Sequence, residues 1–103
     1  MKPIPIQEQV IGSVIEYEFD VAGLLAATDT VSNVSWDVPV QLAIKESLIV
    51  GTKVSAKIEV LLTATVNATY WVTFTVVGSE AVPVTPTLSF PVRSVTKLPV
   101  MVI

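Results

Sequence analysis

Three carboxylates, Glu16, Glu18 and Asp20, alternate along one short segment of the chain. In an extended strand they project from the same face, because successive side chains point to opposite sides. Such a row of oxygen ligands could bind a hard cation such as calcium. Residues on one strand face lie too far apart to surround an ion without a loop, and no Asp-rich loop completes the set. We therefore expect no metal site, but a solvated acidic face paired with Lys53 or Lys57 of a neighbouring strand.

Other catalytic and binding chemistry has few candidates among the 103 residues. The chain has no His and no Cys, which removes the commonest general base, thiolate nucleophiles and the usual zinc ligands. No Gly-rich phosphate loop occurs among the four glycines. The net charge is −3 and the six Lys and Arg residues are scattered, whereas nucleic-acid binding needs grouped cations. We expect no enzyme activity, no cofactor and no nucleic-acid partner.

The most informative segment is NATYWVTFTVV, residues 67–77. Strict alternation with a period of two predicts a β-strand that is buried on one face. The apolar face consists of Tyr70, Val72, Phe74 and Val76. The opposite face carries threonines and Trp71. This tryptophan either packs under a loop or contacts another subunit, since Trp is enriched at protein interfaces.

Apolar residues mixed with prolines occupy both ends of the chain. They are Ile4, Ile6, Val10 and Ile11 at the N-terminal end, and Leu98, Val100, Met101, Val102 and Ile103 at the C-terminal end. So many apolar side chains are not expected in solvated tails. They either fold back as edge strands of their own domain or pair with a neighbour's sheet edge by strand addition. We favour strand addition for at least one arm, and expect a homo-oligomer.

The elements that must position these residues are short strands. Turn signals recur about every ten residues, typical of a β-sandwich. We predict an all-β, immunoglobulin-like antiparallel β-sandwich of about 6–8 strands over residues 13–96, with an extended N-terminal arm (1–12) and a C-terminal arm (97–103). A small closed barrel is the alternative. Trp36 is expected in the core, Gly51 and Asn67 in turns, and Pro91 in an edge strand, because proline lacks an N–H. No membrane-spanning helix and no signal peptide are expected.

Three motifs resemble those of small immunoglobulin-like virion proteins of tailed bacteriophages. The family's W-x-V-P-x-x-L segment is matched by Trp36, Val38, Pro39 and Leu42. Its T-Y-x-V-T-x-x-V strand is matched by Thr69, Tyr70, Val72, Thr73 and Val76, and its final S-F strand by Ser89, Phe90 and, less closely, Val95. The sequence departs from the family where TATVNA and SEAVPVTP replace a glycine-rich turn and a short Gly-Arg hairpin.

The resemblance implies a non-enzymatic structural part of a virion, assembled in the bacterial host cytoplasm with other virion proteins as partners. Such proteins serve as head decoration, or as head-fibre or tail-fibre attachment and adaptor proteins. One alternative is a carbohydrate- or cell-surface-binding module, although the aromatics lie in expected strands and not at loop tips. Another is an immunoglobulin-like repeat of a bacterial surface protein.

Overall fold

Seven β-strands and one 3-10 helix make up the part of the chain that the structure, a computed structural model, describes, residues 5–97. The elements are β1 (Gln7–Val10), β2 (Val14–Asp20), η1 (Ala22–Leu24), β3 (Val31–Asp37), β4 (Leu42–Val50), β5 (Lys53–Val60), β6 (Thr69–Gly78) and β7 (Thr87–Val95). The prediction of an all-β chain is confirmed for these residues.

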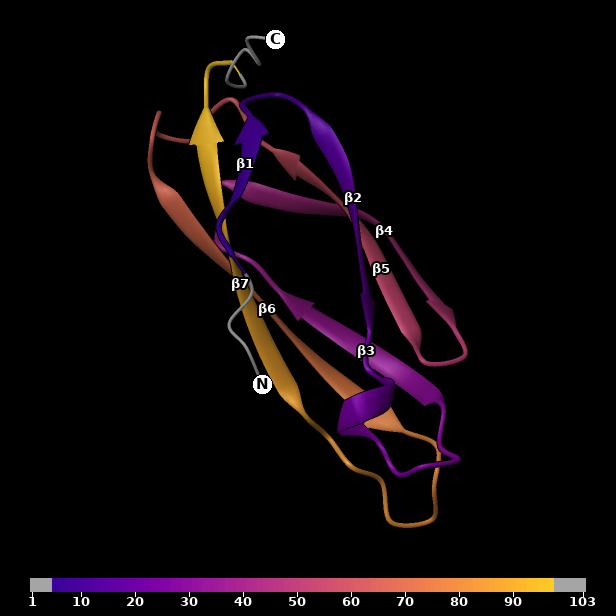
Figure 1. Ribbon diagram of the computed structural model, residues 1–103. Coiled ribbons are helices and arrows are strands. Elements are labelled where there is room, and N and C mark those ends of the chain that lie inside the picture. The colour runs from indigo at the N-terminus through magenta and orange to yellow at the C-terminus, as the bar shows by residue number, and fades with distance from the viewer. Residues whose placement is uncertain (1–4, 98–103) are drawn as a thin grey trace, which may run out of the picture.

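The strands form two sheets, as Figure 1 shows. One has the order β1-β7-β6-β3 and the other the order β2-β5-β4. Neighbouring strands are antiparallel except for β1 and β7, which are parallel. The predicted two-sheet β-sandwich is therefore the observed architecture.

The core lies between the sheets and is built around aromatic rings. Phe19 of β2 reaches across to the other sheet, where its ring centroid lies 5.2 Å from that of Phe74 and 4.9 Å from that of Phe90. Phe74 and Phe90 are completely buried. Burial of a side chain of this size stabilises the fold by about 1.5–3 kcal/mol. These ring contacts join β2 of one sheet to β6 and β7 of the other.

Strand β6 has the two faces that its alternation predicts. Val72, Phe74 and Val76 are completely buried, and Tyr70 packs against the core cluster. Trp71 and the threonines lie on the outer face of the sheet. The predicted alternation of β2 is also confirmed: Tyr17 is buried, whereas its acidic residues are exposed.

Residues 7–10 differ from the expected N-terminal arm, because they form β1 in the chain's own sheet. Gln7 lies opposite Val92 and Val10 opposite Val95 in the parallel pair with β7. The backbone of Ile11 continues this pairing by donating to Val95 O at 2.9 Å. The first of the two alternatives for an apolar end, folding back as an edge strand, therefore applies to this segment.

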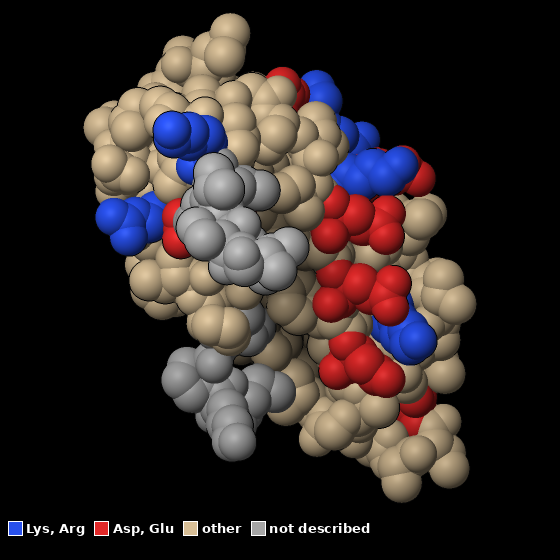
Figure 2. All heavy atoms as spheres, turned by 45° about the horizontal axis from the view of Figure 1, so that its top comes forward, with Lys and Arg blue, Asp and Glu red and all other residues tan. Residues whose placement is uncertain are grey.

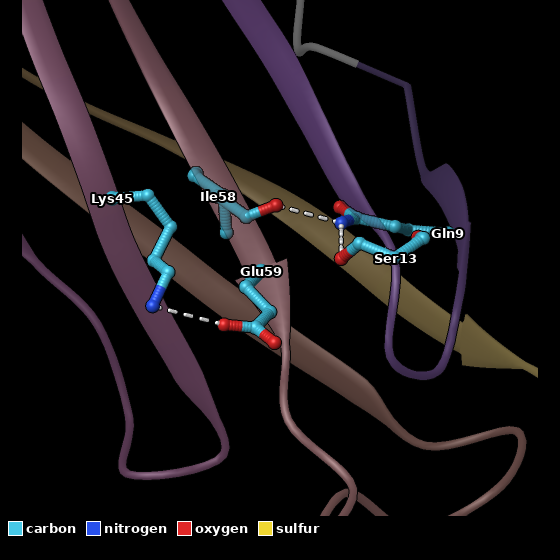
Figure 3. A network of polar contacts seen from close by, with 5 residues as sticks. All are labelled: Gln9, Ser13, Lys45, Ile58 and Glu59. Atoms are coloured by element: carbon cyan, nitrogen blue, oxygen red, sulfur yellow. Dashed lines mark hydrogen bonds and ion pairs between the residues drawn. The ribbon is translucent and has the colours of Figure 1, made fainter.

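A buried glutamine on β1 connects the two sheets (Figure 3). Gln9 is 0% exposed, and its Nε2 donates to Ile58 O of β5 at 2.7 Å and to Ser13 O at 2.9 Å. Its Oε1 accepts from the Tyr17 hydroxyl of β2 at 2.8 Å. Burial raises the pKa of Tyr17 to about 12, because the charged phenolate is poorly solvated there. These hydrogen bonds offset the cost of burying an amide and a hydroxyl group.

The prediction that Pro91 marks an edge strand is wrong, because β7 lies between β1 and β6. Ser94 of β7 donates its N–H to Ala68 O, next to β6. Because successive amides along a strand point to opposite sides, residues an odd number of positions from Ser94 face β1. The nitrogen of Pro91 therefore faces the β1 side. Strand β1 begins only at Gln7, opposite Val92, so the missing N–H leaves no β1 carbonyl unpaired.

At one end of the sandwich a buried carboxylate joins two loops. Asp29 Oδ1 accepts hydrogen bonds from Ser79 N at 2.9 Å, Ser79 Oγ at 2.7 Å and Thr30 N at 2.8 Å. The hydroxyl of Ser79 is the main cause that lowers the pKa of Asp29 below its ordinary value. A Cβ atom at Gly78 would overlap Asp29 Oδ2 and lie 3.2 Å from Cγ, so any larger residue here would have to displace the Asp29 carboxylate.

The turns predicted at Gly51 and Asn67 are confirmed. Gly51 connects β4 and β5 with a φ of 62°, and Asn67 precedes β6 with a φ of 61°. Glycine and asparagine are the residues that adopt this left-handed conformation most readily.

The Gln9–Tyr17 hydrogen bond gives a stability prediction. Gln9→Met leaves the buried Tyr17 hydroxyl without its acceptor, so we expect the free energy of unfolding to fall by about 1–3 kcal/mol. Tyr17→Phe removes that hydroxyl, so the double variant should be more stable than the sum of the single effects predicts. Urea unfolding of all four proteins measures the coupling, and strictly additive effects would show that the bond contributes nothing.

Candidate interaction surface

Trp71 is the most conspicuous side chain on the outer face of the four-stranded sheet. It lies near the start of β6 and is 59% exposed. Its register partner on β7 is Pro91. An indole in this position carries a large apolar area and one N–H donor, a combination suited to a partner that is partly polar. The described residues do not show Trp71 packed under a loop, which was one of the two alternatives expected for it.

A shallow hollow of about 430 Å³ adjoins Trp71. Its lining residues come from the end of β3 and from the first half of β6, and they are Asp37, Val38, Pro39, Thr69, Tyr70, Trp71 and Thr73. The hollow therefore has an apolar part, formed by the indole, the valine and the proline, and a polar part formed by one carboxylate and two threonines.

The hollow lies where β3 stops pairing with β6. The last register pair is Asp37 with Thr73, and Pro39, two residues further on, lacks the N–H that would continue the ladder. The residues of β6 from Thr69 to Val72 precede this point, so no strand within residues 5–97 is paired with them on that side. One stretch of sheet edge is open directly beside Trp71.

The open edge presents hydrogen-bonding groups. The N–H groups of Val76 and Gly78 in β6 donate to the carbonyls of Pro86 and Val84, respectively. Both carbonyls belong to the segment that leads into β7. Because amides alternate along a strand, the backbone groups of Thr69 and Trp71 point the other way, toward the hollow. Among residues 5–97 these groups have no backbone partner on that side.

The rest of the outer face is polar. Thr73 and Ser89 pair through their hydroxyls at 2.8 Å, and Thr75 and Thr87 at 2.9 Å, across β6 and β7. These hydroxyls are satisfied by one another, as is common for cross-strand pairs. Trp71 thus stands at one end of a hydroxyl-covered surface.

Among the residues that the structure describes, those predicted for interfaces are not brought together. Ile6 is 54% exposed, and Val10 and Ile11 are half-buried at β1, which lies on the opposite side of β7 from β6. The remaining predicted interface residues lie outside the described part of the chain. They are Ile4, Leu98, Val100, Met101, Val102 and Ile103. Trp71 is the predicted interface residue that lies in the hollow.

Sequence reasoning missed two features. The first is the hollow, which Asp37 and Pro39 line. The sequence signal for an open edge there was Pro39, because proline cannot continue a strand ladder. Leu48, Ile49 and Val50 also form an exposed apolar run at the end of edge strand β4. These three apolar residues are consecutive, so no alternation with a period of two marks which of their side chains are exposed.

The acidic row of β2 is visible in Figure 2 as neighbouring carboxylates with lysines beside them. Glu18 pairs with Lys53 at 3.9 Å, as predicted, whereas Lys57 pairs at 3.1 Å with Glu46 of β4. The pKa of Asp20 is lowered mainly by the N–H of Ala22. Within residues 5–97, no group of three or more acidic side chains could hold a metal ion.

Comparison with known proteins adds no relative: the chain matches no family model, no curated protein and no solved structure. In the part of the chain that is described, no helix is long and apolar enough to cross a membrane.

The two tryptophans should respond differently to truncation. Trp71→Ala removes an exposed side chain, so we expect the free energy of unfolding to change by no more than about 0.5 kcal/mol. Trp36 stacks on Phe74 at 4.7 Å and donates to Ser47 Oγ at 2.9 Å, so Trp36→Ala should cost about 2–3 kcal/mol. Urea unfolding measures both. A large loss in Trp71→Ala would mean that Trp71 serves packing and not a partner.

Proposed function

We propose that the chain is a non-enzymatic assembly module, an immunoglobulin-like β-sandwich that presents the Trp71 face to a partner protein. The observation that carries this proposal is the exposed indole beside a hollow and an open strand edge. Large exposed aromatics at a concave site are typical anchors of protein interfaces.

Strand order supports the immunoglobulin-like type. Counting β2 as strand B, the order β2-β5-β4 corresponds to B-E-D, and β7-β6-β3 corresponds to G-F-C. Tyr70, at the start of β6, accepts a hydrogen bond from Thr65 N at 2.8 Å through its hydroxyl. A tyrosine bonded to the backbone just upstream of strand F is a recurrent feature of such sandwiches.

The assembly that we propose is the virion of a tailed phage, with the chain as a capsid decoration protein or a head- or tail-fibre adaptor. The support is the resemblance of the W-x-V-P-x-x-L and T-Y-x-V-T-x-x-V motifs. Both motifs contribute to the hollow: Asp37, Val38 and Pro39 belong to the first, and Thr69 to Thr73 belong to the second. The partners would be other virion proteins and further copies of this chain, with assembly in the host cytoplasm.

A carbohydrate-binding module is the second candidate, and the hollow gives it one supporting observation. Trp71 offers a stacking surface, and Asp37, Thr69 and Thr73 place polar groups around it. Sugar rings are bound by such combinations of an aromatic face and hydrogen-bonding side chains.

Purified particles of the phage that encodes the chain test the proposal. Mass spectrometry should find the chain at a fixed ratio to a major capsid or tail protein. Particles assembled with Trp71→Ser should contain at least about tenfold less of it, the effect of losing one interface anchor. Val82→Ser, which alters a still more exposed apolar residue of the β6–β7 loop, should be incorporated normally.

Absence of the chain from washed particles would contradict the virion assignment. If the isolated chain then bound a soluble oligosaccharide with a change in Trp71 fluorescence, the carbohydrate-binding candidate would replace it.

A further inference from the structure

The open edge of β6 determines which kind of polypeptide segment can bind there. Two backbone N–H and two C=O groups, those of Thr69 and Trp71, face the hollow without backbone partners among residues 5–97. A short extended segment laid beside residues 69–72 would supply them as an added strand. Strand addition takes its affinity from main-chain hydrogen bonds and its specificity from alternate side chains.

Side chains at the edge select an apolar segment. Trp71, Val38 and Pro39 border the hollow and would receive the alternate side chains of an added strand. Asp37 is the one charged group of the lining, so an acidic segment would be repelled there. β-branched residues fit such a position best, because they favour extended backbone and pack well on a pleated surface.

One segment of this chain meets these requirements. The sequence continues beyond the described residues with Leu98, Pro99 and then the four residues Val100–Ile103. The side chains of this run are uncharged, three of its four residues are β-branched, and it contains no proline. Four consecutive residues are enough to pair with the open stretch from Thr69 to Val72.

The direction in which the chain leaves β7 indicates whether the segment fills the open edge of its own copy or that of a second copy. After β7 the described chain turns toward the β1 side of the sheet (Figure 1), whereas the open edge lies on the far side of β6. To reach its own edge, beside the start of β6, the segment would have to reverse and pass the ends of both β7 and β6. An edge on a second copy has no such constraint.

We propose that residues 100–103 of one copy add as a strand to the Thr69–Val72 edge of a second copy, with Trp71 covering the added strand. This inference rests on the proposed function, since it names the partner of the Trp71 face as another copy of the chain. Donor and acceptor are different surfaces, so the contact is heterologous and each copy carries one of each.

Complementation between two full-length variants tests the proposal. Trp71→Ala damages the acceptor edge and keeps the donor segment. A second variant, Met101→Pro with Val102→Pro, keeps the edge and loses two adjacent donor N–H groups, one of which must face β6 because amides alternate. The matched control, Met101→Leu with Val102→Ile, retains both N–H groups.

Light scattering should show that the natural chain and the control are oligomers, and that each damaged variant alone is a folded monomer. Mixed in equal amounts, the two variants should form a one-to-one dimer, because one intact donor then meets one intact acceptor. Circular dichroism establishes that each variant is folded.

A monomeric natural chain, or two folded variants that stay monomeric when mixed, would overturn the inference. These outcomes leave the particle experiment unaffected. A chain that is monomeric alone but incorporated through Trp71 would retain the proposed function with a different partner.

Discussion

Every buried or half-buried backbone amide in a β-sandwich needs a hydrogen-bond partner, and this constraint explains where the strands of this protein begin and end. Pro39 ends the β3–β6 ladder, because it cannot donate to the next carbonyl. Pro91 is tolerated inside β7, because its nitrogen faces the side on which β1 has not yet begun. The open edge at Thr69–Val72 is what remains when β3 stops at Asp37.

The connection between the sheets combines apolar packing with one buried polar link. Phe19, Phe74 and Phe90 supply the apolar contacts, which have no preferred register. Gln9 adds directional hydrogen bonds to β5 and to Tyr17 of β2. A short strand such as β1 buries little surface, so we infer that this polar link fixes its position on β7.

Sequence periodicity predicted the faces of β2 and β6, because each strand turns one side toward the core and the other toward solvent. Residue type predicted the turns at Gly51 and Asn67. The sequence did not predict β1, since two prolines make its segment look like an arm whether or not it pairs. Periodicity also carries no information about which strands are neighbours. The position of Trp71 on an outer face was predictable, but the open edge beside it depends on the register of Asp37 with Thr73.

The central claim is that the Thr69–Val72 edge is filled by the C-terminal segment of another copy. Amide hydrogen exchange at Thr69 and Trp71 tests it most directly, because these N–H groups are the ones that an added strand would protect. We predict slow exchange in the natural full-length chain and fast exchange when residues 101 and 102 are proline. Equal exchange rates at these two amides in both proteins would contradict it.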